Sequence, residues 1–248
     1  MATETTRSQF DKALLGLRKL ILDRAFEPKS RLAETALSKR LNISRTPLRQ
    51  AMDRLVEEGL LERNKTGGCR VASFSMEDVF DAIELRGVLE GTAVRIAAER
   101  GPVGEILAKC HSVLDLLDRA VSGQPEIDFD AYVDLNAEIH HLMPRLAGSA
   151  ILTREVERIS RLPLASPSAF LQGQEFIPDF QASLWRAQDQ HRRIVRAVEN
   201  REGSRAEALA REHAFLARTN FEHITQNRPA LVRQVPGLAL VSPPARAS

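Results

Sequence analysis

The first sixty residues place apolar side chains at helical spacing. Between Ser8 and Arg24 they recur every three or four positions, which predicts an amphipathic helix. These positions are Phe10, Leu14, Leu17, Leu20 and Ile21. Pro28, in the stretch 27–30, ends that helix. The pattern then predicts a short helix over residues 33–41, a tight turn at 42–43, and a third helix from about Arg45 to Glu58, which ends at Gly59.

After Gly59 the pattern changes. The segments 60–63 and 69–72 flank a stretch that ends in two glycines, Gly67 and Gly68, so two short strands around a glycine tip predict a β-hairpin. Beyond Ser75 the sequence predicts only helices. The first begins with Ser75 as N-cap and Asp78 as the partner of a capping box, and it ends at Arg100. The others cover residues 103–121, 129–147, 150–162, 179–200 and 204–226.

Two segments do not follow either pattern. Residues 163–178 contain three prolines and a glycine, and they predict a long loop. Residues 228–248 contain four prolines and few charges, and they predict a poorly ordered tail.

The composition agrees with a helical globular protein. Hydrophobic residues are 43% of the chain, charged residues 27% and aromatic residues only 5%, which favours helices over sheets. No apolar run approaches the length of a membrane span, and the N-terminus has no secretory signal. Two cysteines are too few for a disulfide framework. We therefore expect a cytoplasmic protein with reduced thiols and no membrane partner.

The net charge of +2 is unevenly distributed. Residues 1–75 carry 15 Lys and Arg against 9 Asp and Glu, a balance of 15 − 9 = +6. The remaining residues carry 20 against 24, a balance of 20 − 24 = −4. A basic N-terminal part and an acidic body indicate that the N-terminal part meets a polyanion.

The stretch ISRTPLRQAMDRL, residues 43–55, concentrates this basic character at a helix start. Leu48, Ala51, Met52 and Leu55 share one face, so the helix buries one side, while its first turn presents polar and cationic groups. That end carries the positive pole of the helix dipole and free backbone N–H groups, which suit phosphate. A short helix, a tight turn and such a helix predict a helix-turn-helix; the alternative is a surface helix with ordinary solvated arginines.

Residues 30–71, SRLAETALSKRLNISRTPLRQAMDRLVEEGLLERNKTGGCRV, resemble the winged-helix DNA-binding domain of the GntR superfamily of bacterial transcription regulators. The resemblance lies in the Arg-Leu-Ala-Glu start, the Ser-Arg-Thr-Pro-Leu-Arg motif, the Glu-Glu-Gly-Leu ending and the glycine-tipped wing. It implies that residues 1–75 form a winged helix-turn-helix that binds double-stranded operator DNA. The implied contacts are Arg31, Ser44, Arg45, Thr46, Arg49, Lys65, Thr66 and Gly67. Thr35 stands where fatty-acid-responsive relatives carry arginine, so their operator cannot be assumed.

Histidines suggest a second site. Asn136 and His140 are four residues apart and therefore share a helix face. His191 and His213 each lie 11 residues from position 202, so they would be at the same height in an antiparallel hairpin. Such side chains can converge inside a bundle as a metal site. The alternative for each is an ordinary hydrogen-bonded histidine, which is our assignment for the remaining three, His111, His141 and His223.

Residues 76–227 resemble the all-helical effector domain of the FadR-type branch of the same superfamily, the FCD domain. The matching segments are ELRGVLEGTAVRIAAER, LNAEIHHLMPRLAGS and QHRRIVRAVENREGSRAEALAREHAFL. The resemblance implies a divalent metal, with zinc or nickel expected, and a homodimer. Its metal ligands here would be Asn136, His140, His191 and His213. Asn136 replaces the aspartate that is frequent in the family, and Arg86 would contact a carboxylate effector.

The expected fold is therefore mainly α, with an N-terminal winged helix-turn-helix and an all-α C-terminal bundle. The expected function is a regulator, most simply a repressor, whose operator binding responds to a small organic acid at a metal-containing pocket. Two alternatives remain: a regulator for which the metal ion itself is the signal, and a metalloenzyme in which the three histidines activate water. The enzyme is the weaker alternative, because it leaves the basic winged helix without a purpose.

Overall fold

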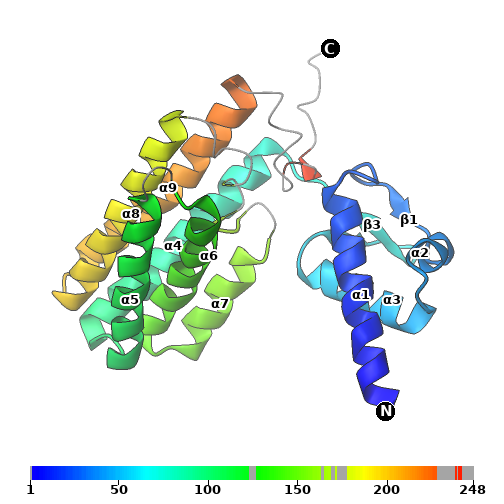
Figure 1. Ribbon diagram of the computed structural model, residues 1–248, viewed down its shortest axis with the longest axis horizontal. Helices are drawn as coiled ribbons and strands as arrows, with labels where there is room; N and C mark the ends of the chain where they lie inside the picture. Colours follow the sequence, from blue (N-terminus) through cyan, green and yellow to red (C-terminus); the bar gives the residue numbers. More distant parts are fainter. Residues whose placement is uncertain are drawn as a thin grey trace. The chain divides into compact units, whose positions relative to one another are not determined.

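The computed structural model describes residues 2–122, 127–162, 165–168, 171, 178–227, 238, 240 and 241. The chain forms two compact units, which are shown in Figure 1. The first, the N-terminal unit, comprises Met1–Val79 with Arg161–Pro163 and Pro236–Ser248. The second, the helical unit, comprises Phe80–Ser160 and Leu164–Val235. The fold is mainly helical with one small sheet, which confirms the predicted fold class.

The N-terminal unit combines three helices with a three-stranded sheet. Its elements are α1 (Ala2–Leu22), β1 (Arg31–Leu32), α2 (Glu34–Leu41), α3 (Arg45–Glu57), β2 (Leu61–Arg63) and β3 (Cys69–Val71). The strand order is β1-β3-β2, and both pairings are antiparallel. The hairpin of β2 and β3 was predicted, whereas β1 was not, because a strand of two residues is too short to show an alternating pattern.

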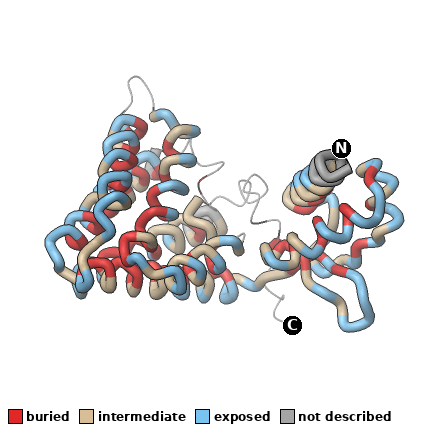
Figure 2. Tube along the Cα trace, turned by 90° about the horizontal axis from the view of Figure 1, so that it is seen from below, coloured by how far each residue is buried: buried red, intermediate tan, exposed pale blue. Residues whose placement is uncertain are grey.

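Apolar faces of the three helices close over the sheet to form the core of this unit. Leu17 and Ile21 of α1 and Leu48 and Leu55 of α3 are at most 1% exposed. Asn42, with φ 53°, occupies the left-handed region at the end of α2 and allows the tight turn into α3. The apolar positions that recur every three or four residues along α1 and α3 are therefore the buried ones. Figure 2 colours the chain by burial.

Part of the segment 228–248 differs from the poorly ordered tail that we expected. Leu238 and Leu240 are buried, and Leu240 belongs to the core of the N-terminal unit. Phe74 donates a backbone hydrogen bond to the carbonyl of Leu240 at 2.9 Å, and Arg24 Nη2 donates to the carbonyl of Leu238 at 3.2 Å. Apolar burial and these two bonds hold the three described residues of the segment; its other residues lie outside the described part of the chain.

The helical unit follows the predicted series of helices closely. Its elements are α4 (Met76–Arg100), which begins in the N-terminal unit, α5 (Gly104–Val121), α6 (Phe129–Leu142), η1 (Met143–Ala147), α7 (Ala150–Ser160), α8 (Pro178–Glu199) and α9 (Gly203–Asn227). The capping box at the start of α4 is present: Ser75 N–H donates to Asp78 Oδ2 at 2.7 Å, and Asp78 N–H donates to Ser75 Oγ at 3.0 Å.

The helix predicted over 129–147 is divided in two. Its α-helical part ends at Leu142, and η1 continues as a 3-10 turn with Pro144 in its first turn. Proline has no N–H to donate to the carbonyl one turn earlier, so the α-helical ladder ends there. The predicted loop over 163–178 lies largely outside the described residues, of which 165–168 and 171 remain.

Close approach of α4 to α9 shapes the interior of the helical unit. A Cβ atom added at Gly87 would lie 2.9 Å from Cβ of Ala214, and one added at Gly91 would lie 3.1 Å from the carbonyl oxygen of Glu207. These glycines let the two helices pack more tightly than larger residues would allow. As a result, the residues of α4 next to Gly87 and Gly91 are brought against the inner face of α9.

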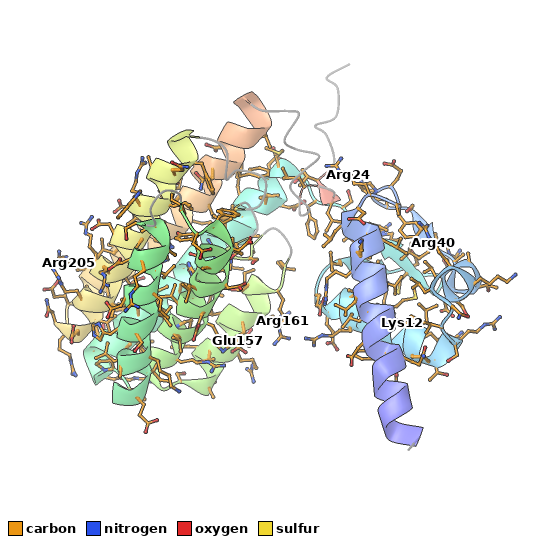
Figure 3. The ribbon with its side chains drawn as sticks, in the orientation of Figure 1. Lys12, Arg24, Arg40, Glu157, Arg161 and Arg205 are labelled. Carbon is orange, nitrogen blue, oxygen red and sulfur yellow. The ribbon has the colours of Figure 1, made fainter. Side chains whose placement is uncertain are left out.

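Charged side chains cover the outside of both units. Figure 3 shows Lys12 and Arg40 projecting from the N-terminal unit and Arg205 from the helical unit. Arg205 pairs with Glu202 at 2.6 Å. None of the described helices combines the length and the apolar character that a membrane crossing requires.

Candidate nucleic-acid interface and metal centre

The start of α3 is exposed to solvent. Ser44 occupies the N-cap position with extended backbone angles (φ −67°, ψ 161°), but its side chain makes no capping hydrogen bond. Ser44, Arg45, Thr46 and Arg49 are all exposed, whereas the next turn of the same helix buries Leu48. The predicted division between a buried apolar face and a cationic first turn is therefore observed, and this turn is free to meet a ligand.

The tip of the hairpin is also exposed. Lys65, Thr66 and Gly67 are accessible, and Gly67 and Gly68 have φ values of 90° and 77°, which glycine adopts without strain. Arg31 Nη2 donates to the carbonyl oxygen of Gly67 at 3.2 Å. This bond connects the first residue of β1 to the tip of the wing.

Arg49 is held by an acidic neighbour. Its Nε donates to Glu34 Oε2 at 2.7 Å, which joins α3 to the first residue of α2. The side chain of Arg49 remains 63% exposed, so its two terminal nitrogens can still meet a partner. Arg31 thus contacts the hairpin tip, while Glu34 and Arg49 join α2 to α3. The sequence did not reveal the role of Glu34, which comes from a contact across 15 residues.

The three histidines singled out in the sequence converge inside the helical unit. His140 on α6, His191 on α8 and His213 on α9 are all buried, and their candidate ligand atoms lie within 4.8 Å of one another. His140 Nε2 is 3.1 Å from His213 Nε2 and 3.4 Å from His191 Nε2. Nitrogens bound about 2.0–2.1 Å from one tetrahedral zinc ion are separated by roughly 3.3 Å, so the spacing fits such an ion.

The opposite nitrogen of each ring faces an acceptor. His140 Nδ1 lies 3.0 Å from Glu90 Oε1, His191 Nδ1 lies 3.2 Å from Gln188 Oε1, and His213 Nδ1 lies 3.1 Å from Gln190 Oε1. Each Nδ1 can therefore carry the proton, which leaves each Nε2 with a lone pair. Three lone pairs then point at one another, an arrangement that a shared cation stabilises. Such outer partners orient metal-binding histidines.

Burial lowers the pKa values of two of these imidazoles, those of His191 and His213. It lowers the pKa of His191 well below 6.5, and the neighbouring His140 lowers it further. The pKa of His213 is also lowered well below 6.5, first by burial and then by the charges of His191, His140 and Arg86. Neutral imidazole is the form that binds metal ions. His191 and His213 are therefore in the metal-binding protonation state at neutral pH.

Glu90 is the residue of this centre that the sequence analysis missed. It is only 2% exposed on α4, beside Gly91 and one turn from Arg86. Burial alone would raise its pKa, but the charges of His140 and Arg86 and the hydrogen bond with His140 lower it, so the carboxylate is ionised. The i, i+4 spacing of Arg86 and Glu90 was the only signal available, and on a helix this spacing is usually a surface ion pair.

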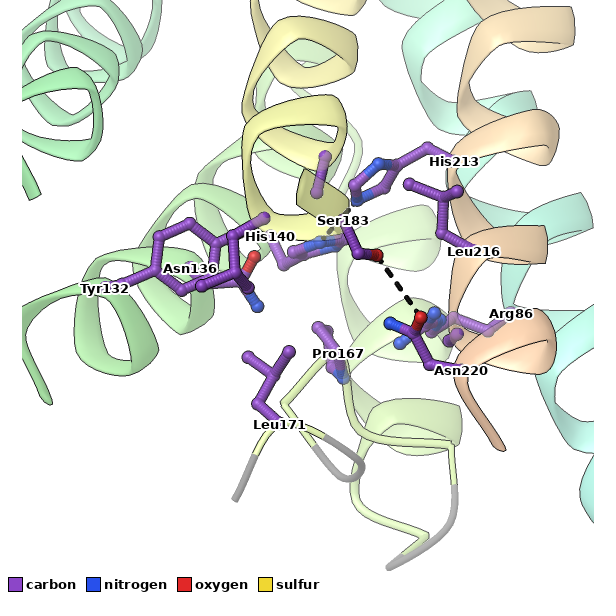
Figure 4. A pocket seen from close by; sticks show the side chains of 13 residues that line it. Arg86, Tyr132, Asn136, His140, Pro167, Leu171, Ser183, His213, Leu216 and Asn220 are labelled. Carbon is purple, nitrogen blue, oxygen red and sulfur yellow. Dashed lines mark hydrogen bonds between the residues drawn. The ribbon is translucent and has the colours of Figure 1, made fainter. Parts of the chain in front are cut away.

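Asn136 has a less direct relation to the histidines. It is buried at 4% exposure, and Figure 4 shows it beside His140 in the same pocket. Its Nδ2 donates to Ser168 Oγ at 3.3 Å, which leaves Oδ1 as a possible ligand atom. Of the other histidines, His111 and His141 are partly exposed beside Glu199 and Glu157, as expected of non-ligands. The side chain of His223 lies outside the described part of the chain.

A pocket opens against this centre. It encloses an empty volume of about 450 Å³ including its mouth, and it is lined by both apolar and polar side chains. His140 and His213 form one part of its wall, and Arg86 lies in another. The structure therefore brings Arg86, Asn136, His140 and His213 to one cavity, whereas His191 contacts His140 but does not line it.

Comparisons with known proteins match both parts of the chain. The family description "FCD domain" matches residues 81–215, and "Bacterial regulatory proteins, gntR family" matches residues 11–71. The chain belongs to the gntR family of bacterial regulatory proteins. Members of this family are transcription regulators that bind DNA, and the names of the relatives likewise describe regulators and not enzymes.

Two relatives illustrate the range of this GntR-family similarity. The Nta operon transcriptional regulator of Aminobacter aminovorans is 36% identical over 135 residues, which are 54% of this chain and 62% of the relative, less than two thirds of its length. The HTH-type transcriptional repressor GlaR of Escherichia coli strain K12 is 29% identical over 192 residues, 76% of this chain and 84% of the relative.

Solved structures share the GntR fold at low sequence identity. A structure described as Lar, which controls expression of the Listeria monocytogenes agr system, superposes with a TM-score of 0.64 at 16% identity, covering 86% of this chain and 96% of the other. Escherichia coli McbR/YncC superposes with a TM-score of 0.57 at 18% identity, covering 88% and 97%. At such identities the similarity concerns the fold alone.

Proposed function

We propose that this GntR-family protein is a cytoplasmic repressor that releases its operator when a small organic acid binds at a metal-containing pocket. The observation that carries the proposal is the convergence of three buried histidines, two of which, His140 and His213, line a cavity that is also lined by Arg86. The relatives named repressors support the direction of control.

On the DNA side, the exposed first turn of α3 would enter the major groove. Arg45 and Arg49 would meet guanine edges or phosphates, while Ser44, Thr46 and Arg31 would meet the DNA backbone. Lys65, Thr66 and Gly67 at the wing tip would reach the neighbouring minor groove. The exposure of all these residues and the bond between Arg31 and Gly67 support this division of roles.

On the ligand side, His140, His191 and His213 would hold a divalent ion such as zinc or nickel, with Asn136 Oδ1 as a further oxygen ligand. When bound, the ion would offer a Lewis-acid site to a carboxylate oxygen. Glu90, Gln188 and Gln190 hold the rings in the tautomer that exposes Nε2. Arg86 supplies a fixed positive charge within the same cavity.

Control of the operator would require a homodimer, because two DNA-binding domains can then read two half-sites of a palindrome. An acid could shift such a dimer only by as much as it prefers one arrangement of these domains over the other. Helix α4 is one covalent connection between the two units, since it begins in the N-terminal unit and carries Arg86 and Glu90 in the helical unit.

A second candidate function is supported by the self-sufficiency of the histidine cluster. Three buried histidines, each with its own acceptor, can hold an ion without any organic ligand. In that case the metal ion would itself be the signal. Titration of operator binding with zinc or nickel, in the absence of acids, distinguishes the two candidates.

The proposed function is tested with an operator selected from random duplexes by repeated binding to the purified protein. Fluorescence anisotropy then measures operator affinity for zinc-loaded and chelator-stripped protein, with and without a panel of short carboxylic acids. We expect acids to release DNA from the zinc-loaded protein only. Release that is equal in the stripped protein would contradict the role of the metal centre.

A further inference from the structure

The C-terminal end of the described chain belongs to the N-terminal unit. Helix α9 ends at Asn227 in the helical unit, whereas Leu238, Leu240 and Val241 lie in the N-terminal unit. We refer to these three residues as the C-terminal turn, because Val241 N–H donates to the carbonyl oxygen of Leu238 at 3.2 Å. Figure 1 shows this turn in red beside α1. The chain therefore returns from the helical unit to the N-terminal unit after α9.

Burial and a polar contact hold the C-terminal turn in place. Leu238 is 1% exposed and Leu240 is 0% exposed. Leu240 belongs to the same core as Leu17 of α1 and Leu55 of α3. Arg24, which follows α1 and is labelled in Figure 3, donates from Nη2 to the carbonyl oxygen of Leu238 at 3.2 Å. Since removal of apolar area from water is the main favourable contribution to folding, the C-terminal turn is an internal part of the N-terminal unit.

The C-terminal turn binds the joint between β3 and α4. Phe74 lies in this joint, and its N–H donates to the carbonyl oxygen of Leu240 at 2.9 Å. Phe74 also forms a parallel β-bridge with Val241, and its side chain packs against the core that contains Leu240. The next residue, Ser75, is the N-cap of α4 in the capping box with Asp78. Helix α4 therefore begins directly after a residue that the C-terminal turn holds.

The two helices from which the chain leads to this joint, α4 and α9, pack against each other. Phe80 of α4 contacts Phe221 of α9 edge to face, with ring centroids 5.7 Å apart. Further along α4, Gly87 lies against Ala214 of α9. Residue numbers thus rise along α4 while they fall along α9, so the helices are antiparallel. The first residues of α4 in the helical unit and the last residues of α9 therefore lie at the same end of that unit.

We infer that the C-terminal turn is a second attachment of the N-terminal unit, in addition to α4, and that it limits the orientations in which this unit meets DNA. Each residue of a free joint would contribute two rotatable backbone dihedrals. The bond to Phe74 N–H and the burial of Leu240 restrict these dihedrals directly before α4. Because the turn follows α9, a displacement of α9 acts on the same joint as a displacement of α4. The inference goes beyond the proposed function and requires neither metal nor acid.

Hydrogen–deuterium exchange of the full-length protein, without DNA, tests the attachment at Phe74. Leu240→Ala removes most of a fully buried side chain, so the amide of Phe74 should exchange at least about tenfold faster. Leu15→Ala is the matched control, because Leu15 of α1 is 62% exposed, and it should leave this amide unchanged. Amides of α5 report whether the helical unit stays folded. Exchange at Phe74 that Leu240→Ala does not accelerate would overturn the attachment.

Arg24→Met is a milder variant of the same contact. It keeps an apolar stem but removes the donor to the carbonyl oxygen of Leu238, so exchange at Phe74 should increase by a smaller factor. Lys12→Met, at an exposed position of α1, is the control for the loss of one positive charge. Melting temperatures are measured for all variants. If Leu240→Ala does not fold, the comparison of Arg24→Met with Lys12→Met decides whether the attachment exists.

Operator duplexes with altered half-site spacing test the limit on orientation, with the proposed homodimer as the DNA-binding species. We expect the wild-type protein to prefer the selected spacing at least about tenfold over a spacing lengthened by about two base pairs. Leu240→Ala should reduce this preference below about threefold, because less constrained units reach both spacings. Affinity for a duplex with a single half-site should change by less than about threefold, because each unit still contacts its bases.

The outcomes separate this inference from the proposed function. Equal spacing preference in the wild-type protein and in a variant with accelerated exchange at Phe74 would overturn the limit on orientation. Wild-type protein that binds all spacings equally would overturn it as well. Failure to bind any duplex would overturn the proposed function, while exchange at Phe74 would still decide whether the attachment exists.

Discussion

Glu90 Oε1 on α4 lies 3.0 Å from His140 Nδ1 on α6, so a buried carboxylate determines which nitrogen of that histidine faces the other two. Because His140 Nε2 is the atom closest to both His191 and His213, Glu90 controls the shared centre of the cluster. The same helix carries Arg86 into the pocket, and it begins in the DNA-binding unit. One helix therefore carries residues of the histidine cluster and of the pocket and begins in the N-terminal unit.

Glu90→Gln should weaken zinc binding by roughly tenfold to a hundredfold, the usual cost of losing an outer partner of a metal-binding histidine. The substitution keeps the shape of the side chain but removes the charge that favours a proton on Nδ1. Competition with a chromogenic chelator measures the affinity. Glu99→Gln, on the exposed end of the same helix, is the control and should leave zinc affinity unchanged.

His191→Ala and His213→Ala should each reduce the zinc retained by the purified protein, because each removes one of three converging nitrogens. Metal content by inductively coupled plasma mass spectrometry is the measurement. His141→Ala is the matched control, since this histidine neighbours His140 in sequence but is partly exposed beside Glu157. Full zinc occupancy in both ligand variants would show that the cluster is not the metal site.

Asn136→Asp should raise zinc affinity, because it replaces a neutral oxygen by an anionic one beside the same cluster. The accompanying loss of the bond from Asn136 Nδ2 to Ser168 Oγ should cost little, since that bond is long at 3.3 Å. The chelator competition used for Glu90→Gln measures the change. Unaltered affinity in the aspartate variant would indicate that residue 136 does not reach the ion.

Arg49→Ala should weaken operator binding by about 1–3 kcal/mol if the arginine reads a base, with relaxed specificity at that position.

Glu34→Gln should lower the ratio of operator affinity to random-duplex affinity. Glu34 holds Arg49 Nε at 2.7 Å, so the substitution releases Arg49 from its position. Glu34 also repels phosphate, so its loss favours binding to any duplex. Anisotropy on both duplexes gives the ratio. Glu57→Gln at the far end of α3 is the control; a ratio unaffected by Glu34→Gln would mean that the pair does not position Arg49.

The stability of the metal-free protein should depend on pH through His191 and His213. Their pKa values are lowered in the fold, so below pH 6.5 the unfolded chain binds protons that the folded protein does not. The free energy of unfolding is therefore unaffected by these groups above about pH 6.5. Below this pH the free energy of unfolding decreases by up to about 1.4 kcal/mol per pH unit for each histidine, or about 2.7 kcal/mol per pH unit for both.

Urea denaturation of chelator-stripped protein at pH 7.5, 6.5 and 5.5 measures this dependence. His191→Gln removes one of the two groups and should reduce the slope by about half. A free energy of unfolding that does not change between pH 6.5 and 5.5 would contradict neutral burial of the pair. The lowered pKa of Glu90 acts only at more acidic pH, because its ordinary value is already 4.5.

Much of the fold follows from local sequence. Helix positions in both units were predictable from apolar residues three or four apart. The capping box was predictable because Asp78 follows Ser75 by three positions. The similar heights of His191 and His213 were also predictable, since two regular helices joined by a short turn fix the heights of their side chains. The participation of His140 was implied by the family resemblance. These features depend on periodicity within an element, which the sequence displays directly.

Only the tertiary structure decided which side chains distant in the sequence contact one another. Glu90 meets His140 across 50 residues, Arg86 meets Ala165 across 79, and Arg49 meets Glu34 across 15. Strand β1 exists because β3 lies beside it, and Leu240 is buried because the N-terminal unit offers it an apolar surface. The sequence by itself determined which faces are apolar and which residues are candidates to bind metal or DNA. Packing determined which charges are buried together, because close contact between distant residues depends on how whole helices meet.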